Sequence, residues 1–452
     1  MFENILGQSS ASQLADNIKN GNMAPSMLFE GPVSSGKAST ALELGRVMSC
    51  ELNAEWNCAC GSCTKHRLLL HPDLLCLGNR LFSAEIAAAG DAFTREEIKP
   101  SSKLLFIRSV RKLLLRFNPV LWEDEPKFSK LSNLVLSLEE DLDEFASLEA
   151  EAETNTKIKI INSIIKDAYK LESSGISSAV PIEQIRKASY WCHLAPFGKG
   201  KLLLIENADS MKEGARNSLL KLLEEPPQAV TIVLTTSRQN ALLKTILSRL
   251  RPYRFILRPE HVEIEVLDRI FHKNNFIPDE ASVNCCTNRP GLINAYLDTF
   301  MPLSSNTLKI LAAFFAASAA YKAALLLRKR GFVLPTELVL LGKLSAPIAE
   351  ESGFLKSESS KEVTAKIIEG ASGFEVRSMF TLFCNFLLAM VSDSLKYSTS
   401  NMPSCAFFMD LWRMNIQEAE AAVMTYNQNI SLALERLFID LSNGMAEINC
   451  SK

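Results

Sequence analysis

The residues best suited to chemistry lie in one short run near the start of the chain, Gly31-Pro32-Val33-Ser34-Ser35-Gly36-Lys37-Ala38. Its spacing, G-x-x-x-x-G-K, is that of a loop that binds the phosphates of a nucleotide. In such a loop, backbone N–H groups and the N-terminus of the following helix hold phosphate, and the lysine reaches the outer oxygens. The sequence therefore predicts a nucleotide site that includes Gly31, Ser35, Gly36, Lys37, Ala38 and Ser39.

One position in this loop lacks the group that the chemistry needs. Ala38 stands where a serine or threonine normally supplies the hydroxyl that holds Mg²⁺. The neighbouring hydroxyl of Ser39, or a water molecule, would have to substitute for it. The loop can therefore have the right shape and still be poor at nucleotide chemistry.

A second defect lies at the end of an apolar strand. Residues 201–209 have the form of a strand that ends in acid, where the carboxylate of Glu206 would meet Mg²⁺ through water. The next position, where a second acid would activate the attacking water, is Asn207, and an amide cannot act as a general base. Asp209 could rescue some activity, but it would leave the strand at a different angle. We expect ATP to bind weakly or not at all.

One cysteine-rich segment has spacings typical of a metal site. Cys60-x-x-Cys63-x-x-His66 offers three ligands for a tetrahedral Zn²⁺ ion, and Cys50 or Cys58 would supply the fourth. We favour Cys50 because it closes a loop, whereas Cys58 lies close to Cys60 on one turn. No H-x-E or H-E-x-x-H sequence accompanies the segment, so we expect structural zinc. The alternative is a set of free cysteines.

The composition is that of a soluble chain with several domains. At 452 residues the chain is too long for one hydrophobic core. Its net charge of −2 gives no global sign of nucleic-acid or membrane binding. The first residues lack a signal-peptide pattern and the clustered cysteines indicate a reducing compartment, so we expect a cytoplasmic protein. The most apolar stretch, 310–321, is shorter than the ~20 residues that a membrane helix needs, and we expect a buried helix there.

Strands and helices alternate in the first half of the chain. Apolar strands are expected at 27–29, 74–77, 201–206, 231–237 and 254–256. Their alternation with helices predicts an α/β fold with a parallel sheet and a ligand site at the carboxyl ends of its strands. From about 82 to 178 the pattern becomes that of a helical insertion, whose basic and acidic segments can pair with each other or serve a partner. After residue 259 the pattern is helical, apart from a polar loop at 392–402.

Taken together, the motifs resemble one protein family. Residues 1–80 and 180–300 look like those of bacterial clamp-loader AAA+ subunits of DNA polymerase III, of the delta-prime and gamma/tau kinds. The segments that carry the resemblance are Phe2–Gln8, Leu28–Pro32 with the phosphate loop, the cysteine segment with His71-Pro72-Asp73, Ile182–Arg186, Asn217–Pro227 and Thr245–Arg249. The run L-L-K-x-L-E-E-P-P, combined with S-R after T-I-L, is highly specific to that group.

The resemblance implies a domain plan and a set of partners. It predicts a RecA-like AAA+ domain at 1–257, which contains the zinc knuckle at 50–66 and the insertion, then an all-α lid at 258–302 and an all-α collar at 303–452. In the family the collar joins five subunits, gamma/tau and delta among them, into a ring. That ring opens the sliding clamp and places it on primer-template DNA during replication. This chain is thus expected to contact DNA only as part of the assembly, and the resemblance implies no membrane partner.

The resemblance also assigns roles to individual residues. Lys37 would be the Walker lysine and Glu206 the Walker B acid. Thr236 would lie near the sensor 1 position and Arg289 near sensor 2. Arg249 would be an arginine finger that acts on the nucleotide of a neighbouring subunit.

The departures from the family pattern favour one kind of subunit. His66 stands where the family usually has its last cysteine ligand. Ala38 and Asn207 weaken metal handling and water activation, which favours delta prime, the subunit that typically does not hydrolyse ATP, over an ATP-hydrolysing gamma/tau motor. No paired-aspartate site is apparent, so we expect no polymerase activity in this chain. The insertion is not part of the usual pattern.

Overall fold

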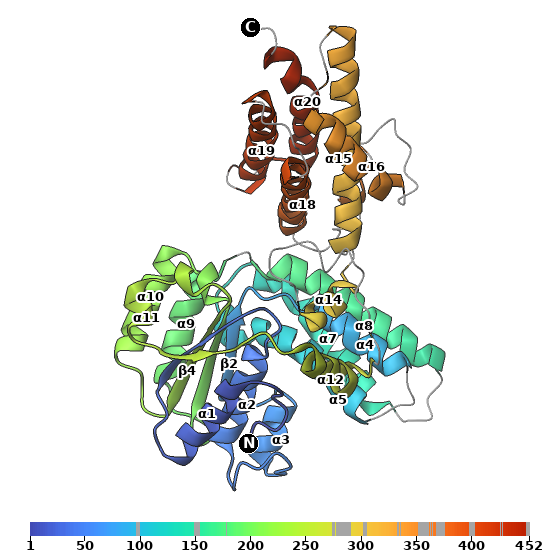
Figure 1. Ribbon diagram of the computed structural model, residues 1–452. Coiled ribbons are helices and arrows are strands. Elements are labelled where there is room, and N and C mark those ends of the chain that lie inside the picture. Colours follow the sequence, from blue (N-terminus) through green and yellow to red (C-terminus); the bar gives the residue numbers. More distant parts are fainter. Residues whose placement is uncertain are drawn as a thin grey trace. The chain divides into compact units, whose positions relative to one another are not determined.

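The chain forms two compact units, Met1–Ile277 with Gly291–Phe300, and Pro278–Pro290 with Met301–Lys452. The first unit contains a β-sheet and helices, and the described part of the second contains helices alone (Figure 1). The computed structural model describes residues 1–95, 100–148, 154–177, 179–273, 276, 291–301, 305–331, 334, 336–350, 361, 363, 365–367, 376–396, 403–424, 426 and 428–448.

A five-stranded parallel sheet with the order β2-β3-β4-β1-β5 organises the first unit and confirms the predicted α/β fold. Its register pairs Glu30 with Thr236 and Gly78 with Glu206, so the polar ends of four strands meet at one edge. The strands are β1 (Ser26–Glu30), β2 (Leu74–Gly78), β3 (Lys201–Glu206), β4 (Val230–Thr236) and β5 (Arg251–Arg254).

The last strand begins and ends earlier than the predicted 254–256. β5 covers Arg251–Arg254, and pairing with β1 ends there in the strand register. The backbone of Ile256 is held instead by the side-chain amide of Gln8, which donates to its carbonyl (2.8 Å) and accepts from its N–H (3.0 Å). The opening segment of the chain therefore supplies hydrogen bonds to the backbone just beyond the end of β5.

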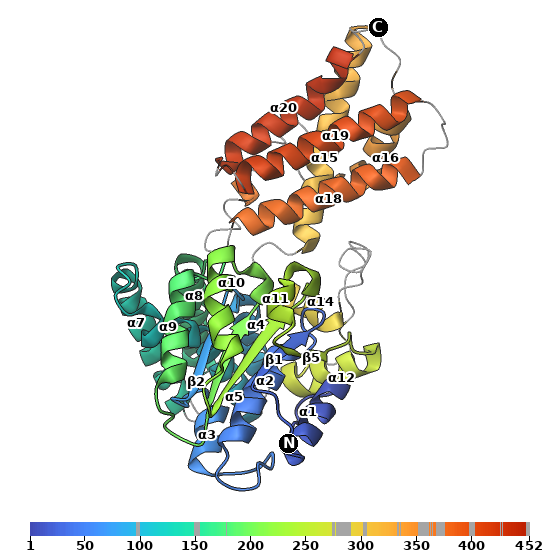
Figure 2. The same cartoon turned by 90° about the vertical axis from the view of Figure 1, so that its left-hand side faces the viewer.

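Helices cover both faces of the sheet (Figure 2). Because successive side chains of a strand point to opposite faces, Met27 and Phe29 belong to one core cluster and Leu28 to the other. The first cluster includes residues of α1 (Ser9–Lys19) and α2 (Lys37–Ser49). The second includes residues of α9 (Ile182–His193) and α10 (Glu213–Glu224), and it extends into the helical insertion.

The insertion is helical, as predicted, and it is part of the main core rather than an appendage. Phe106, Leu138 and Phe145 are fully buried in the same cluster as Leu203 of β3. The short η1 packs against β2, an outer strand of the sheet. The elements are α4 (Ser83–Arg95), α5 (Pro100–Leu114), η1 (Leu115–Phe117), α6 (Pro119–Trp122), α7 (Phe128–Ser147) and α8 (Thr154–Gly175).

Charged residues of the insertion form pairs with each other and with the rest of the unit. Arg111 lies 3.9 Å from Asp143, which agrees with the expectation that basic and acidic segments pair. Glu172 of α8 accepts hydrogen bonds from the backbone N–H groups of Phe82 and Ser83, at the N-terminus of α4. The two ends of the insertion are thus joined by a buried carboxylate at a helix N-terminus, where negative charge is favoured.

Two further helices complete the first unit. α12 (Glu260–Phe271) and α14 (Leu292–Asp298) pack on each other and on α4, and they share a small apolar cluster that contains Ala88, Val266 and Tyr296. They fall within the predicted lid, 258–302, of which the structure describes only part. The remaining short elements are α3 (Gly61–Arg67), η2 (Ala208–Ser210), η3 (Gln239–Ala241) and α11 (Lys244–Leu247).

The second unit is a bundle whose longest helix, α15, contacts three of its neighbours (Figure 2). The helices are α15 (Ser305–Lys329), α16 (Thr336–Glu350), α18 (Val376–Lys396), α19 (Pro403–Met424) and α20 (Ile430–Ile448). The polar loop predicted at 392–402 is helical through Lys396, because α18 continues beyond its apolar stretch, and 397–402 lie outside the described residues.

α15 is longer than the apolar stretch that predicted it. Its segment Thr307–Lys329, with a mean hydropathy of 1.9, is long and apolar enough to cross a membrane by length and composition alone. The estimate from 310–321 was therefore too short. Its inner face is nevertheless buried, and Phe315 packs against the rings of Phe383 (5.5 Å) and Phe438 (5.4 Å). This is the packing expected of a core helix.

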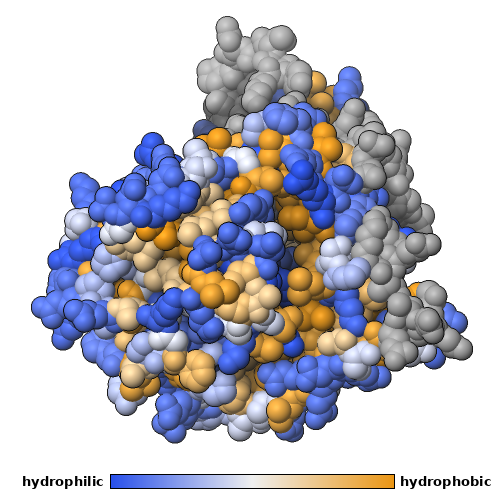
Figure 3. Space-filling model, turned by 90° about the horizontal axis from the view of Figure 1, so that it is seen from below, coloured by the Kyte–Doolittle hydropathy of each residue, from blue (hydrophilic) through white to orange (hydrophobic). Residues whose placement is uncertain are grey.

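The surface mixes hydrophilic and hydrophobic residues, and the hydrophobic ones gather toward the middle of the view in Figure 3. Two large aromatic side chains of the first unit are conspicuously exposed, Tyr190 of α9 (70%) and Phe197 in the loop that follows (73%). Aromatic residues are enriched at protein contact surfaces, so this end of α9 is suited to contact with another protein.

The insertion's place in the core can be tested by truncating a buried ring. Phe145 packs on Phe93 (5.0 Å) and Phe106 (4.8 Å), so Phe145→Ala should lower the free energy of unfolding of the first unit by ~3–5 kcal/mol. The control is Leu136→Ala on the same helix, which is 55% exposed and should change it by no more than ~0.5 kcal/mol. Chemical denaturation followed by circular dichroism measures both. Equally small effects would make the insertion peripheral.

Candidate nucleotide and metal sites

The phosphate loop has the backbone that its two glycines permit. Gly31 has φ 149°, and a Cβ there would overlap the carbonyl oxygen of Phe255. Gly36 has φ 95° and immediately precedes α2, so the loop turns into the helix through a left-handed residue. Both conformations favour glycine. The first turn of α2 therefore presents its free N–H groups toward the loop, as phosphate binding requires.

Lys37 is folded back onto its own loop. Its Nζ donates to the carbonyl oxygens of Gly31 (2.7 Å) and Pro32, and lies 3.4 Å from Oγ of Ser35. Burial, and after it the positive charge of the nearby Arg80, lower the pKa of Lys37 to about 8. A polyphosphate at the loop would supply the negative charge that this buried ammonium lacks. The loop thus fits phosphate.

An arginine that the sequence did not single out secures the loop. The guanidinium of Arg258 donates to the carbonyl oxygens of Ser34 (2.9 Å) and Leu6 (2.8 Å). It is 8% exposed and lies over Gly36. Arg258 thus joins the N-terminal segment to the phosphate loop. It lies more than 200 residues further along the chain than either of them, so no local sequence motif predicts the contact.

Glu206 lies at the carboxyl end of β3, as predicted, but its carboxylate is already occupied. Arg80 donates to Oε1 at 3.0 Å, and Arg116 of η1 donates to Oε2. Arg80 also pairs with Glu85 (2.8 Å), which in turn pairs with Lys112. This charge network joins the end of the sheet to the insertion. Sequence reasoning missed it because its members lie far apart along the chain.

The two residues considered for water activation cannot act as a free base here. Asn207 is an amide in a left-handed conformation (φ 53°), and its backbone N–H donates to Oγ1 of Thr235 (3.3 Å). Asp209 accepts from Oγ1 of Thr236 (2.7 Å) and from Nε of Arg238 (3.0 Å). Both oxygens of Asp209 are thus engaged, and Thr236 is buried beside them.

The residues that would hold Mg²⁺ do not fit it. Ala38 offers no oxygen, and Ser39 follows it on the same half-buried turn of α2. Thr40 uses its hydroxyl to donate to the carbonyl of Gly36 (2.9 Å). The one acid of the Walker B position, Glu206, is bonded to two guanidinium groups. The site therefore suits a phosphate anion and not the metal that normally accompanies it.

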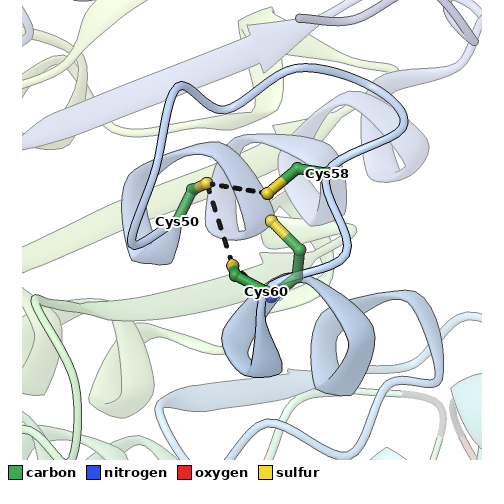
Figure 4. Close-up of side chains that lie close together, drawn as sticks. Cys50, Cys58 and Cys60 are labelled. Atoms are coloured by element: carbon green, nitrogen blue, oxygen red, sulfur yellow. Dashed lines mark hydrogen bonds between the residues drawn. The ribbon is translucent and has the colours of Figure 1, made fainter.

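The four clustered cysteines come together as a metal site would require, and Figure 4 labels three of them, Cys50, Cys58 and Cys60. The sulfurs of Cys50, Cys58, Cys60 and Cys63 all lie within 4.8 Å of one another, and Cys50 Sγ is 3.6 Å from Cys58 Sγ and 3.9 Å from Cys60 Sγ. Tetrahedral zinc with Zn–S bonds of about 2.3 Å separates its sulfurs by about 3.8 Å. The geometry and the donor set both fit Zn²⁺.

The group contains Cys58, the alternative ligand, and leaves out His66, which we had expected. His66 is buried and stacks on the ring of His71 at 4.1 Å. Its ring nitrogens find no hydrogen-bond partner among the residues that the structure describes, and burial lowers its pKa to about 3. It is a neutral core residue, one helical turn beyond Cys63 in α3.

A buried arginine supports the cysteine segment from α2. Arg46 pairs with Glu43 (2.7 Å) and donates to Sγ of Cys63 (3.2 Å) and to the backbone carbonyls of Ala54 (3.1 Å) and Glu55 (3.0 Å). Burial raises the pKa of the Cys63 thiol, and the guanidinium of Arg46 opposes that rise by favouring the thiolate, the form that binds a metal. The helix that follows the phosphate loop therefore also holds the cysteine segment in place.

The predicted arginine finger lies on the surface. Arg249 pairs with Glu224 (2.6 Å) and donates to the carbonyl of Thr245 (2.6 Å), and its side chain is 32% exposed. It follows α11 and precedes β5. Arg289, predicted near sensor 2, lies outside the described residues.

A parallel sheet with a phosphate loop at the carboxyl end of its β1 strand gives the first unit the architecture of a P-loop domain. The family model described as "DNA polymerase III, delta subunit" matches residues 7–118 and 130–258, together more than half of the chain. The chain therefore belongs to the delta-prime and gamma family of DNA polymerase III clamp-loader subunits. The matched residues include most of 82–178, so the match does not set the insertion apart.

Curated relatives match over shorter segments. The delta-prime subunit of Bacillus subtilis is 41% identical over 70 residues, 15% of this chain and 21% of that protein. The delta-prime subunit of Pseudomonas aeruginosa is 33% identical over 84 residues, 18% of this chain and 26% of that protein. The gamma/tau subunit of Mycobacterium tuberculosis is 24% identical over 115 residues, 25% of this chain and 20% of that protein. The chain thus matches about a fifth to a quarter of each relative's length.

Among solved structures, a DNA polymerase III gamma subunit-related protein from Thermotoga maritima matches 59% of this chain and 80% of its own, with 20% identity and a TM-score of 0.24.

Zinc content distinguishes Cys58 from His66 as the ligand that completes a site with Cys50, Cys60 and Cys63. We expect about one zinc per purified chain. Cys58→Ser should lose most of it, because one of the four close sulfurs is removed, whereas His66→Ala should keep it. Native mass spectrometry of the folded variants measures the bound metal. Full loading of Cys58→Ser together with a metal-free His66→Ala would restore His66 as the ligand.

Proposed function

We propose that this chain is a delta-prime-type subunit, a stator of the DNA polymerase III clamp loader that does not itself turn over ATP. The observation that carries the proposal is the state of the catalytic groups. Ala38 and Asn207 lack the required oxygen and base, and Glu206 and Asp209 are both bonded to arginines. A motor subunit needs these groups for metal binding and water activation.

The alternative is an ATP-hydrolysing gamma/tau-type motor. It is favoured by the intact Lys37 and by the shape of the phosphate loop, and gamma/tau subunits are among the relatives. It would need Ser39 to replace the missing hydroxyl, and a carboxylate to be released from its arginine. Two independent defects would then have to be compensated, which makes the stator the simpler proposal.

The stator would act on its neighbours in a cytoplasmic ring of clamp-loader subunits. Arg249 would leave its exposed pair with Glu224 and approach the nucleotide of the adjacent subunit. Such a pair is worth only ~0–1 kcal/mol, so releasing it costs little. The lid at 258–302 and the collar at 303–452 would provide the contacts that join the ring, and the ring would load the sliding clamp on primed DNA.

Phosphate release by the isolated, purified chain tests the stator proposal. We expect no Mg²⁺-dependent turnover above the level of Lys37→Ala, because the groups that bind metal and activate water are absent or occupied. Robust turnover that Lys37→Ala abolishes would mean that the defects are compensated. The chain would then be a motor of the gamma/tau kind.

The arginine finger is tested in the reassembled loader. Arg249→Ala should leave folding intact and lower the DNA-stimulated ATPase of the assembly by ~10³-fold at the one affected site, the size of effect that arginine fingers have elsewhere. Arg269→Ala is the matched control, an exposed arginine that also pairs with a glutamate (2.7 Å to Glu265). An ATPase rate equal to that of the control would remove the assignment.

A further inference from the structure

Both oxygens of the Glu206 carboxylate are bonded to guanidinium groups, at the place where Mg²⁺ would be held. Arg80 binds one oxygen at 3.0 Å and Arg116 binds the other. Glu206 is 3% exposed and Arg116 is 5% exposed, so water does not screen the interaction. An arginine keeps its charge at any ordinary pH, so both oxygens of Glu206 stay paired with a cation.

The insertion fixes Arg116 in this position. The backbone carbonyl of Arg116 accepts a hydrogen bond from Nε1 of Trp122 (2.7 Å), and this bond orients η1. The ring of Phe82 lies near both guanidinium groups, 5.1 Å from that of Arg80 and 5.3 Å from that of Arg116. The two cations are therefore positioned by packing as well as by the carboxylate between them.

A contribution to stability alone does not explain the ion pair between Arg116 and Glu206. Burying a charged pair adds little stability compared with apolar side chains of the same size. Arg116 also keeps two buried donors, Nε and Nη1, without a partner among the described residues. Each such donor carries a desolvation cost. Apolar residues at both position 116 and position 206 would avoid these costs, so the retention of the charged pair calls for another reason.

We propose that Arg116 and Arg80 take the place of Mg²⁺ at Glu206, so that the phosphate loop is a metal-independent site for a nucleoside triphosphate. Two guanidinium charges supply the positive charge that the divalent ion supplies elsewhere, and Ala38 removes the other metal ligand. The charge of Arg80 also acts on Lys37, whose pKa it lowers, so the positive charge extends to the phosphate loop. This inference rests on the stator proposal, because it explains how nucleotide is held without being turned over.

The test is the effect of Mg²⁺ on nucleotide affinity. The full chain is titrated calorimetrically with AMP-PNP, a non-hydrolysable ATP analogue, once in MgCl₂ and once in EDTA. The natural chain should bind it with affinities that agree within ~twofold. Arg116→Met frees one carboxylate oxygen, so Mg²⁺ should then raise the affinity by ~tenfold. A residue that only stabilises the fold would not change the dependence on metal.

Further variants keep the test decisive. Arg80→Met frees the other oxygen from a side chain that is 32% exposed, and it serves if Arg116→Met does not fold. Arg116→Lys keeps the positive charge and should keep the indifference to metal. Arg111→Met is the matched control, because Arg111 lies on the same insertion but bonds to the carbonyl of Leu68 (3.0 Å) and not to Glu206.

Three results would overturn the inference. These are a natural chain that binds AMP-PNP only with Mg²⁺, a natural chain that does not bind it at all, and arginine variants that stay indifferent to metal. Phosphate release from ATP in the same samples separates this inference from the stator proposal. It should stay at background in every variant, since Ala38 and Asn207 are unchanged. Release by the natural chain would contradict the stator proposal, while the metal dependence still decides the role of Arg116.

Discussion

The ion pairs of Glu206 hold together the parts of the first unit that matter for function. The carboxylate ends β3, Arg80 follows β2, and Arg116 comes from the insertion, so one buried group joins two strands and the added helices. Removing one partner of a buried pair leaves a charge without compensation and typically costs ~3–5 kcal/mol. The carboxyl edge of the sheet cannot therefore be rearranged without disturbing the insertion, and the reverse is also true.

The insertion is an integral part of the first unit. Its rings and leucines continue the core that begins on the sheet, and Glu172 closes it by binding the N-terminus of α4. The basic residues of α5 serve the cysteine segment as well, since Arg108 and Arg111 donate to the backbone carbonyls at the end of α3. One set of helices thus supports both the candidate metal site and the nucleotide site.

The sequence predicted what depends on short spacing. The phosphate loop and four of the five strands follow local patterns and lie where they were expected, whereas the cysteine cluster forms with Cys58 in the place predicted for His66. Spacing could not predict which side chains point toward the candidate metal site. His66 follows Cys63 by one turn of α3, and the rise of about 4.5 Å places its ring beyond the sulfurs. Nor could spacing predict Arg116, which meets Glu206 across 90 residues of sequence through tertiary packing alone.

The two outer strands of the sheet also limit how copies or partners can associate. η1 packs against β2, and β5 carries Pro252, which has no N–H to donate, with the exposed Arg251 and Arg254 at its two ends. Pro252 therefore interrupts the row of backbone groups that β5 would offer to another chain's strand. The ring proposed above would therefore be joined through side chains on helices and loops. That kind of contact can open and close without breaking a hydrogen-bonded ladder.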